Sequence, residues 1–364
     1  MTQNDDEIGT VPRDMRLRGR GVASNAVGRF EGAVRVAVDD GWSAPEDMVL
    51  RTEVRLEQAR SAISYNASPD LPFDRSVNPY RGCEHGCAYC YARPSHAYLN
   101  LSPGLDFETK LIARPGIGAV LAKELRARAY RPAVIAIGTN TDPYQPIEAT
   151  HRVMREVLEV LRDFQHPVAI TTKGTLIERD LDILGPMGAA GLARVGVSMT
   201  TLDAGLSRTL EPRAPAPARR LAMIRRLTDA GVPVRVMVAP VIPGLTDPEM
   251  EAILEAARDA GAVAASWIML RLPGEVEGLF RDWLAQHAPG RAEKVLARLA
   301  DLHNGASYDA SFGVRMRGRG IWSDLIAKRF DLALGRLGLS LRQPPMRCDL
   351  FAPPAQAGDQ LRLF

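Results

Sequence analysis

The chain has 364 residues, of which 46% are hydrophobic and 24% charged, and its formal net charge is +3. This length suffices for one large domain with extensions or for two ordinary domains. The composition is typical of soluble globular proteins, and so small a positive charge does not by itself indicate a nucleic-acid partner. No apolar run reaches the roughly 18–20 residues that cross a bilayer. Residues 1–9 lack the apolar core of a signal peptide, so we expect a cytoplasmic protein without a membrane partner.

The amino-terminal part of the chain shows little periodicity. Residues 1–28 are mostly polar and include a basic, glycine-containing run at 16–21, so we predict a flexible or loosely draped segment. Residues 29–71 form a second extension, in which valines alternate with other residues at 34–38 in a way that suits a short strand.

From about residue 72, short apolar segments alternate with amphipathic ones. Strands or extended segments are predicted at 73–80, 134–137, 168–172, 194–199, 234–238 and 264–270. Helices are predicted at 115–128, 149–164, 177–184, 218–230, 248–260, 279–286 and 292–302. About six strand–helix units favour a parallel sheet covered by helices, and hence an α/β fold with a partial (β/α)6 TIM-like barrel. The active site of such a barrel gathers at the carboxyl ends of its strands.

We place the core domain at 72–275 and a helical, arginine-rich extension at 276–364. A helix over 322–334 is predicted to end at Gly335. Five arginines of this extension offer either a contact to phosphate or a solvated face, namely Arg315, Arg317, Arg319, Arg342 and Arg347.

Three of the four cysteines lie within eight residues. Cys83, Cys87 and Cys90 have the spacing C-x3-C-x2-C, and clustered thiolates are the preferred ligands of iron–sulfur clusters. Three ligands leave one iron of a 4Fe-4S cube open, as catalytic zinc sites leave one position open. The alternative is a zinc site that adds His85 or His96 to the three cysteines.

The cysteine motif, with Tyr89 just before its last cysteine, is similar to the signature of the radical S-adenosylmethionine (SAM) superfamily. The neighbouring segments 78–83 and 141–148 resemble its spore photoproduct lyase-like branch, whose members are often labelled DNA repair photolyases. The resemblance spans residues 72–275.

This resemblance implies a 4Fe-4S cluster and SAM as cofactors, with an external one-electron reductant such as flavodoxin or ferredoxin. The amino and carboxylate groups of SAM would chelate the open iron, and one electron would break the S–C5′ bond. The resulting 5′-deoxyadenosyl radical would abstract a hydrogen atom from the substrate, while the protein positions both molecules.

The resemblance also assigns residues to the cofactor. Tyr89 belongs with the cofactor-binding side chains. Asp142, in the loop 138–142, would meet the amino group of SAM, or would merely form a turn. Lys173 and Ser198 would hold the SAM carboxylate, since a lysine in a barrel mouth needs an anion; a solvated lysine and a capping serine are the alternative.

Two further positions follow later strands. Glu211 would contact ribose or SAM, or would belong to a surface turn. Ile242 lies in the segment 239–244, which resembles the apolar segment under the adenine, or is a rigid proline-rich loop.

Tyr91 matches an aromatic residue that is implicated, in spore photoproduct lyases, in returning a hydrogen atom to the substrate. The cysteine donor of those enzymes is replaced by Thr139. Cys348 is the remaining thiol, and it would serve as donor only if the tail folds over the barrel mouth. The substrate is therefore not assigned. A DNA-lesion lyase and a non-catalytic iron–sulfur electron carrier are the alternative functions, and a nucleic-acid partner has weak support.

Overall fold

The computed structural model describes residues 19–30 and 50–355 of the chain. The strand predicted at 34–38 lies outside these ranges. None of the helices within them combines the length and the apolar character needed to span a bilayer.

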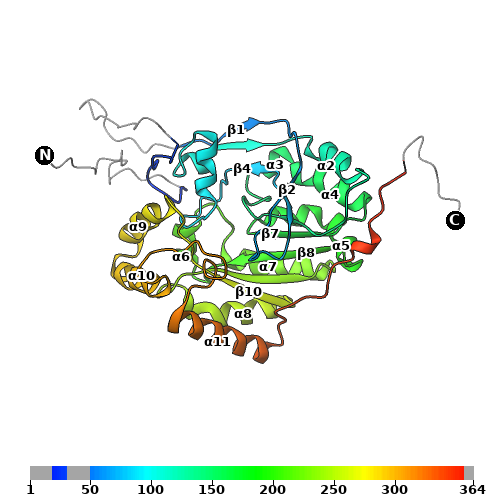
Figure 1. Ribbon diagram of the computed structural model, residues 1–364. Helices are drawn as coiled ribbons and strands as arrows, with labels where there is room; N and C mark the ends of the chain where they lie inside the picture. Colours follow the sequence, from blue (N-terminus) through cyan, green and yellow to red (C-terminus); the bar gives the residue numbers. More distant parts are fainter. Residues whose placement is uncertain (1–18, 31–49, 356–364) are drawn as a thin grey trace.

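A seven-stranded sheet forms the centre of the molecule, in the order β10-β9-β8-β7-β6-β3-β2 (Figure 1). Six neighbouring strands are parallel, and β2 pairs antiparallel at the edge. The strands are β2 (Ile63–Tyr65), β3 (Arg75–Val77), β6 (Ile135–Ile137), β7 (Val168–Thr172), β8 (Ala193–Met199), β9 (Val234–Val241) and β10 (Ala264–Met269). The predicted α/β fold with a partial (β/α)6 barrel is confirmed.

A smaller sheet, ordered β1-β5-β4, lies beside the start of the barrel. It comprises β1 (Glu53–Leu56), β4 (Tyr80–Arg81) and β5 (Lys110–Ala113). The segment between β4 and β5 carries the three clustered cysteines, followed by the 3-10 helix η1 (Arg93–Leu99) and the short helix α1 (Asp106–Thr109).

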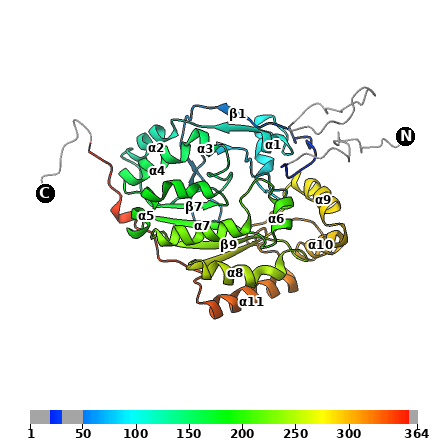
Figure 2. The same cartoon turned by 180° about the vertical axis from the view of Figure 1, so that it is seen from behind.

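Helices connect the parallel strands and cover one face of the sheet (Figure 2). They are α2 (Ile117–Leu125), α3 (Glu148–His151), α4 (Val153–Asp163), η2 (Thr175–Asp180), α5 (Leu181–Ala189), α6 (Ala204–Leu210), α7 (Pro217–Asp229), η3 (Asp247–Glu249) and α8 (Met250–Asp259). The prediction of one helix over 149–164 is wrong, because Arg152 has a φ of 51° and separates α3 from α4. The helix predicted at 177–184 is likewise a 3-10 helix that continues as α5.

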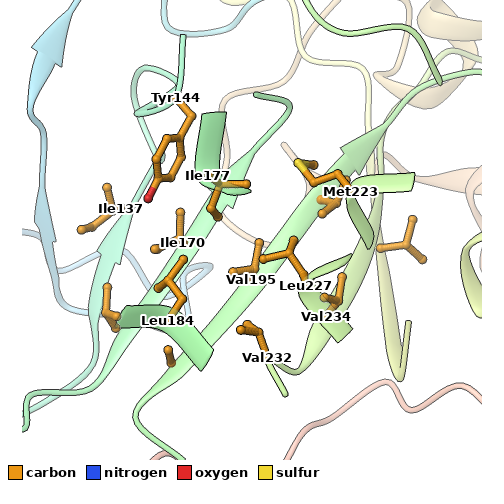
Figure 3. Packing of buried hydrophobic residues seen from close by; sticks show 14 of the residues in the cluster. Ile137, Tyr144, Ile170, Ile177, Leu184, Val195, Met223, Leu227, Val232 and Val234 are labelled. Atoms are coloured by element: carbon orange, nitrogen blue, oxygen red, sulfur yellow. The ribbon is translucent and has the colours of Figure 1, made fainter. Parts of the chain in front are cut away.

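Alternation along the strands gives the sheet two different faces. Ile170, Val195 and Val234 are buried against Leu184 and Leu227 of the covering helices, as Figure 3 shows. The side chains between them point into the barrel, and many stay partly exposed, including Ala169, Thr171, Met237, Ala239 and Ser266. These residues are small or flexible, whereas a closed barrel fills its interior with bulky side chains. The inner face is therefore partly open to solvent.

The carboxyl-terminal extension consists of α9 (Val276–His287), α10 (Pro289–Leu302), α11 (Gly320–Leu337) and η4 (Cys348–Leu350). Helix α11 packs outside α8, as Figures 1 and 2 both show. Gly335 lies inside α11, contrary to prediction. The helix ends instead at Gly338, whose φ of 68° suits a left-handed cap.

The tail after α11 crosses beneath the amino ends of the strands. Ser340 bridges to Ala264 at the start of β10. The carbonyls of Leu341 and Pro344 then accept hydrogen bonds from Arg235 of β9 and Arg194 of β8. Further contacts join Arg347 to Gly191 and Ala352 to Phe164. Cys348 therefore lies at the amino ends of the strands, so the tail does not bring it over the mouth, as a role as hydrogen donor would require.

Residues 19–28 also differ from the flexible segment that the sequence suggests. Arg20, Val22 and Ser24 are buried, and they pack beside the cysteine loop and α1.

Candidate functional site

The cysteine loop (residues 83–90) leaves β4 and lies at the carboxyl-end side of the barrel. Gly82 enters it with a φ of 74°, and a Cβ there would stand 2.9 Å from the carbonyl oxygen of Phe107. That close approach lets the amide of Cys83 donate to the same carbonyl at 2.9 Å. Cys83 and Cys87 are buried, and Cys90 is half-buried.

The loop after β6 grips the cysteine loop from one side. The Thr141 hydroxyl donates to the Tyr80 carbonyl at 3.0 Å. The Gln145 amide donates to the Gly82 carbonyl at 3.0 Å and accepts from the Glu84 amide at 2.8 Å. The two segments singled out in the sequence, 78–83 and 141–148, therefore form one interlocked unit. A second contact reinforces it, because the Tyr80 hydroxyl donates to Glu148.

Arg93 grips the loop from the other side. Its guanidinium is fully buried and donates to the Cys87 carbonyl through Nε at 3.0 Å and Nη2 at 2.8 Å. It also donates to the carbonyls of Pro103 and Gly104 and pairs with Glu108 at 2.5 Å. A buried guanidinium engaged by so many acceptors holds the loop in one conformation.

Asp142 joins the cysteine loop to the end of β7. Its carboxylate accepts hydrogen bonds from the Thr172 hydroxyl and the Lys173 amide, both at 2.6 Å, and lies 3.3 Å from His85 Nδ1. Burial opposes its ionisation, but His85 and these hydrogen bonds hold the pKa of Asp142 at about 2. The carboxylate is thus a fixed negative charge that is already surrounded by protein donors.

Glu211 is 1% exposed, so the alternative of a surface turn is wrong. Its carboxylate accepts from the Tyr89 hydroxyl, from the Thr200 hydroxyl at 2.9 Å, and from the fully buried Arg220. Burial opposes ionisation, but the Arg220 and Lys173 charges hold the pKa of Glu211 at about 2. The buried Glu211 carboxylate therefore holds the Tyr89 side chain of the cysteine loop in place.

Lys173 and Ser198 lie at the carboxyl ends of neighbouring strands. The Lys173 ammonium lies 4.0 Å from Glu211 and over the Tyr89 ring at 5.9 Å, with 15% of its side chain exposed. Burial lowers the pKa of Lys173, but the nearby Cys87 and Glu211 outweigh it, so the net shift is upward. The Ser198 hydroxyl donates to the Ala239 carbonyl at 2.9 Å, which joins β8 to β9.

Ile242 follows β9 and is fully buried. It packs in one apolar cluster with Cys87, Tyr89 and Leu270. Its backbone is also engaged, because its amide donates to the Thr246 hydroxyl at 2.9 Å. The residue lies next to the cysteine loop and its side chain is covered by protein, and its contact with the adenine of SAM stays a prediction.

Tyr91 faces the mouth of the barrel and is 44% exposed. Its hydroxyl donates to the Thr139 carbonyl after β6. The guanidinium of Arg271, which follows β10, lies 4.6 Å from the ring centroid. Arg271 has no ion-pair partner in the described part of the chain, and its buried Nε has no hydrogen-bond partner there. A cation without an anionic partner among the described residues therefore stands at the mouth.

The donor set fits an iron–sulfur cluster chemically. Burial raises the pKa of Cys83, and it raises that of Cys87 to about 12, so both thiolates need a compensating cation. No three His, Cys, Asp or Glu side chains among the described residues are arranged around a single metal ion. A 4Fe-4S cube takes each thiolate on a different iron, so its ligands need not converge on one point. The two histidines of the zinc alternative point elsewhere: His85 to Asp142 and His96 to the Lys110 carbonyl.

Sequence reasoning missed several residues that shape this site, namely Arg93, Glu108, Gln145, Arg220 and Arg271. Long polar side chains near loops are ordinarily solvated, and nothing in their spacing marks these as buried. Their partners lie up to dozens of residues away. The Gln145 position was flagged only through the segment around it.

Of the five arginines in the extension, three have partners within the protein. Arg315 pairs with Asp70 at 2.8 Å, Arg347 pairs with Asp349 at 2.6 Å, and Arg317 lies over the Trp267 ring at 4.0 Å. Arg319 and Arg342 are exposed. The extension therefore does not present five free cations to a phosphate backbone.

Several known proteins are similar to this chain in sequence. The Mycobacterium bovis protein Mb2609c and the Mycobacterium tuberculosis protein Rv2578c are each 36% identical over 301 residues, covering 81% of this chain and 87% of theirs. The Methanocaldococcus jannaschii protein MJ0683 is 25% identical over 48% of this chain and 62% of its own.

Among solved structures, spore photoproduct lyase complexed with dinucleoside spore photoproduct has the same fold. The TM-score is 0.58 at 15% identity, and the match covers 79% of this chain and 81% of that one. The sequence profile described as the Radical SAM superfamily matches residues 77–257, which contain the cysteine loop and the strand ends around it. The chain belongs to the radical SAM superfamily.

Proposed function

We propose that this protein is a radical SAM enzyme that holds a 4Fe-4S cluster on Cys83, Cys87 and Cys90. When bound, the cluster supplies the electron that cleaves SAM into methionine and a 5′-deoxyadenosyl radical. The observation that carries the proposal is the cysteine loop itself, which is fixed at the mouth of a partial barrel and presents three thiols beside Lys173. An external one-electron reductant, such as flavodoxin or ferredoxin, completes the reaction.

The protein's own residues bind and orient SAM. Lys173 is the cation best placed for the SAM carboxylate, because it is mostly buried beside Cys87. Asp142 and Glu211 support the site without contacting SAM, since their carboxylates already accept hydrogen bonds from protein donors. Asp142 fixes the Lys173 backbone, and Glu211 holds Tyr89 and balances Lys173. Ser198 sets the distance between β8 and β9.

The charge at the mouth of the barrel favours an anionic substrate. Strands β6 to β10 contain no Asp or Glu, and Arg194 and Arg235 donate to carbonyls of the tail at the amino ends of the strands, away from the mouth. Arg271 lies at the mouth and has no ion-pair partner in the part of the chain that the structure describes. An anion placed near Arg271 would lie next to Tyr91.

Two other functions are alternatives to a radical SAM enzyme that acts on an unknown substrate. A DNA-lesion lyase is favoured by the shared fold with spore photoproduct lyase. A non-catalytic electron carrier would need no cation beside the cluster loop, so Lys173 and Arg271 speak against it.

The test is anaerobic reconstitution followed by addition of dithionite and SAM. We expect about four irons per chain and release of 5′-deoxyadenosine. Replacing Cys83, Cys87 or Cys90 by Ala should abolish both, whereas Cys348→Ala should change neither, because that thiol lies at the other end of the barrel. Tight zinc without a brown chromophore would overturn the proposal.

A further inference from the structure

The segment 19–26, which we name the N-terminal strap, lies against the outer side of the cysteine loop. Gly21 makes the closest approach: a Cβ at this position would stand 1.5 Å from the Gly86 carbonyl oxygen and 3.2 Å from the Ala88 amide nitrogen. The two backbones therefore touch without an intervening side chain. Such an approach requires glycine.

Hydrogen bonds connect the strap to a cysteine of the loop. The Gly21 amide donates to Glu108 Oε2 at 3.0 Å, and Arg20 donates to the Glu108 carbonyl at 3.0 Å. The other oxygen of the Glu108 carboxylate pairs with Arg93, which donates to the Cys87 carbonyl. The path from strap to cysteine is thus continuous and buried.

A second path runs through the other terminal nitrogen of the Arg20 guanidinium. Arg20 Nη2 donates to the Thr52 hydroxyl at 3.1 Å, and that hydroxyl donates to Glu84 Oε1 at 2.6 Å. Glu84 belongs to the cysteine loop and also pairs with Arg213 at 2.8 Å. Arg20 is therefore connected to the cysteine loop by two routes, one through Glu108 and one through Thr52 and Glu84.

The second half of the strap is anchored just as closely to the segment after η1. A Cβ at Gly104 would stand 2.2 Å from the Ser24 carbonyl oxygen, which accepts from the Leu105 amide at 3.2 Å. The Asn25 side chain exchanges hydrogen bonds with Asp106 at 3.0 and 3.3 Å. The strap is held at both ends.

We infer that the N-terminal strap is the outer wall of the cluster site: it fixes the cysteine loop from outside and shields the cluster from solvent. The inference rests on the proposed function, because the cluster is what the wall protects. Arg20 and Gly21 are positioning residues, since they act through Glu108, Arg93 and Gly86.

Matched glycine substitutions in the full chain test the wall. Gly21→Ala and Gly104→Ala add one methyl group at the two contacts of the strap. Gly278→Ala adds it on α9 where nothing lies within 4 Å. Gly188→Ala adds it against the Gly231 carbonyl, 2.8 Å away near the amino end of β9, and so destabilises the protein away from the cluster.

The readout is the rate at which anaerobically reconstituted protein releases iron to an excess of chelator. We expect Gly21→Ala and Gly104→Ala to release it about tenfold faster than wild type or more, as a barrier lowered by about 1.4 kcal/mol would produce. Gly278→Ala and Gly188→Ala should release it at the wild-type rate. Wild-type release from both strap variants, or equally fast release from Gly188→Ala, would overturn the inference.

Hydrogen exchange of the apo protein separates this inference from the proposed function. In Gly21→Ala the amides of residues 83–90 should exchange faster than in wild type, without any cluster present. If wild type binds no iron, the proposed function fails, while unchanged exchange in the variant refutes the wall. Arg20→Gln removes contacts without adding volume and takes the place of Gly21→Ala should that variant not fold; its residues 83–90 should also exchange faster.

Discussion

Gln145 shows how one buried side chain connects two loops that are distant in sequence. Its amide occupies both the Gly82 carbonyl and the Glu84 amide, on either side of Cys83. The side chain is fully buried, so water cannot replace it. The conformation of the cysteine loop therefore depends on a residue that is neither charged nor a ligand.

Replacing Gln145 by Leu should destabilise the protein by roughly 2–4 kcal/mol, because two buried backbone groups lose their partners. Denaturant unfolding of the apo protein measures the loss. Gln286→Leu, at an exposed position of α9, should stay within about 0.5 kcal/mol of wild type. Equal stability of the two variants would show that the loop does not need Gln145.

Lys173→Ala should weaken SAM binding by roughly ten- to a hundredfold, since a buried charge-assisted contact contributes about 1–3 kcal/mol. The iron content should stay unchanged, because Lys173 is not a ligand. Anaerobic calorimetry with SAM measures the affinity, and Lys328→Ala on the exposed side of α11 is the control. Unchanged affinity in Lys173→Ala would remove this residue from the SAM site.

At the scale of elements, the tail after α11 closes the bottom of the sheet and ends on an aromatic cluster. Phe351 lies 5.6 Å from the Tyr130 ring and 5.5 Å from the His166 ring. His166 is fully buried, and its Nε2 lies 2.6 Å from the Tyr130 hydroxyl. Burial lowers the pKa of His166 to about 4. The folded protein therefore keeps this imidazole neutral.

The low pKa makes stability depend on pH. Between about pH 6.5 and pH 4 the unfolded chain binds a proton at His166 and the folded chain does not. The contribution of His166 to stability should thus fall by up to roughly 3 kcal/mol as the pH drops through 6.5, and this contribution should level off below about pH 4. His166→Phe should remove this part of the acid loss, and His151→Gln, at a half-buried position, should keep it. Identical pH profiles for wild type and His166→Phe would contradict the assignment.

For the whole molecule, the sequence predicts regular elements well and irregular packing poorly. The strand predicted at 168–172 coincides with β7, because alternating buried residues repeat over its full length. The broken helix at Arg152 was missed, because the apolar spacing continues across the break. The strap was missed as well. It is held by glycine contacts and by partners far along the chain, and these leave no periodic pattern in the sequence.

The candidate site divides in the same way. The cysteine loop and the strand-end positions of Lys173 and Ser198 are where the motif and the barrel predict them. The sequence did not predict that the carboxylates of Asp142 and Glu211 are buried and bonded to protein groups. Their partners include His85 and Arg220, which come from other elements. Their roles toward SAM stay predictions.

The arrangement of the whole molecule also bears on spore photoproduct. Repair ends when a thymine radical takes a hydrogen atom from a nearby weak bond, and a thiol offers one. In this chain Thr139 replaces the donor cysteine of spore photoproduct lyases. The O–H bond of threonine is far stronger than an S–H bond. Cys348 lies beneath the amino ends of the strands, across the barrel from the cysteine loop. Tyr91, whose hydroxyl is bonded to the Thr139 carbonyl, would have to donate alone.

We therefore predict that reduced enzyme with SAM will not turn over a dinucleoside spore photoproduct repeatedly, although it cleaves SAM. Thr139→Cys, which puts a thiol on the loop after β6 beside Tyr91, should raise the yield of repaired thymines, since the substrate radical then has a donor. Thr228→Cys is the control and should not, because Thr228 lies on α7 with its hydroxyl bonded to the Gly261 carbonyl at the amino end of β10. Chromatography of the thymine products distinguishes the three proteins. Several clean turnovers by wild type would show that the tyrosine suffices and that the missing cysteine does not limit the chemistry.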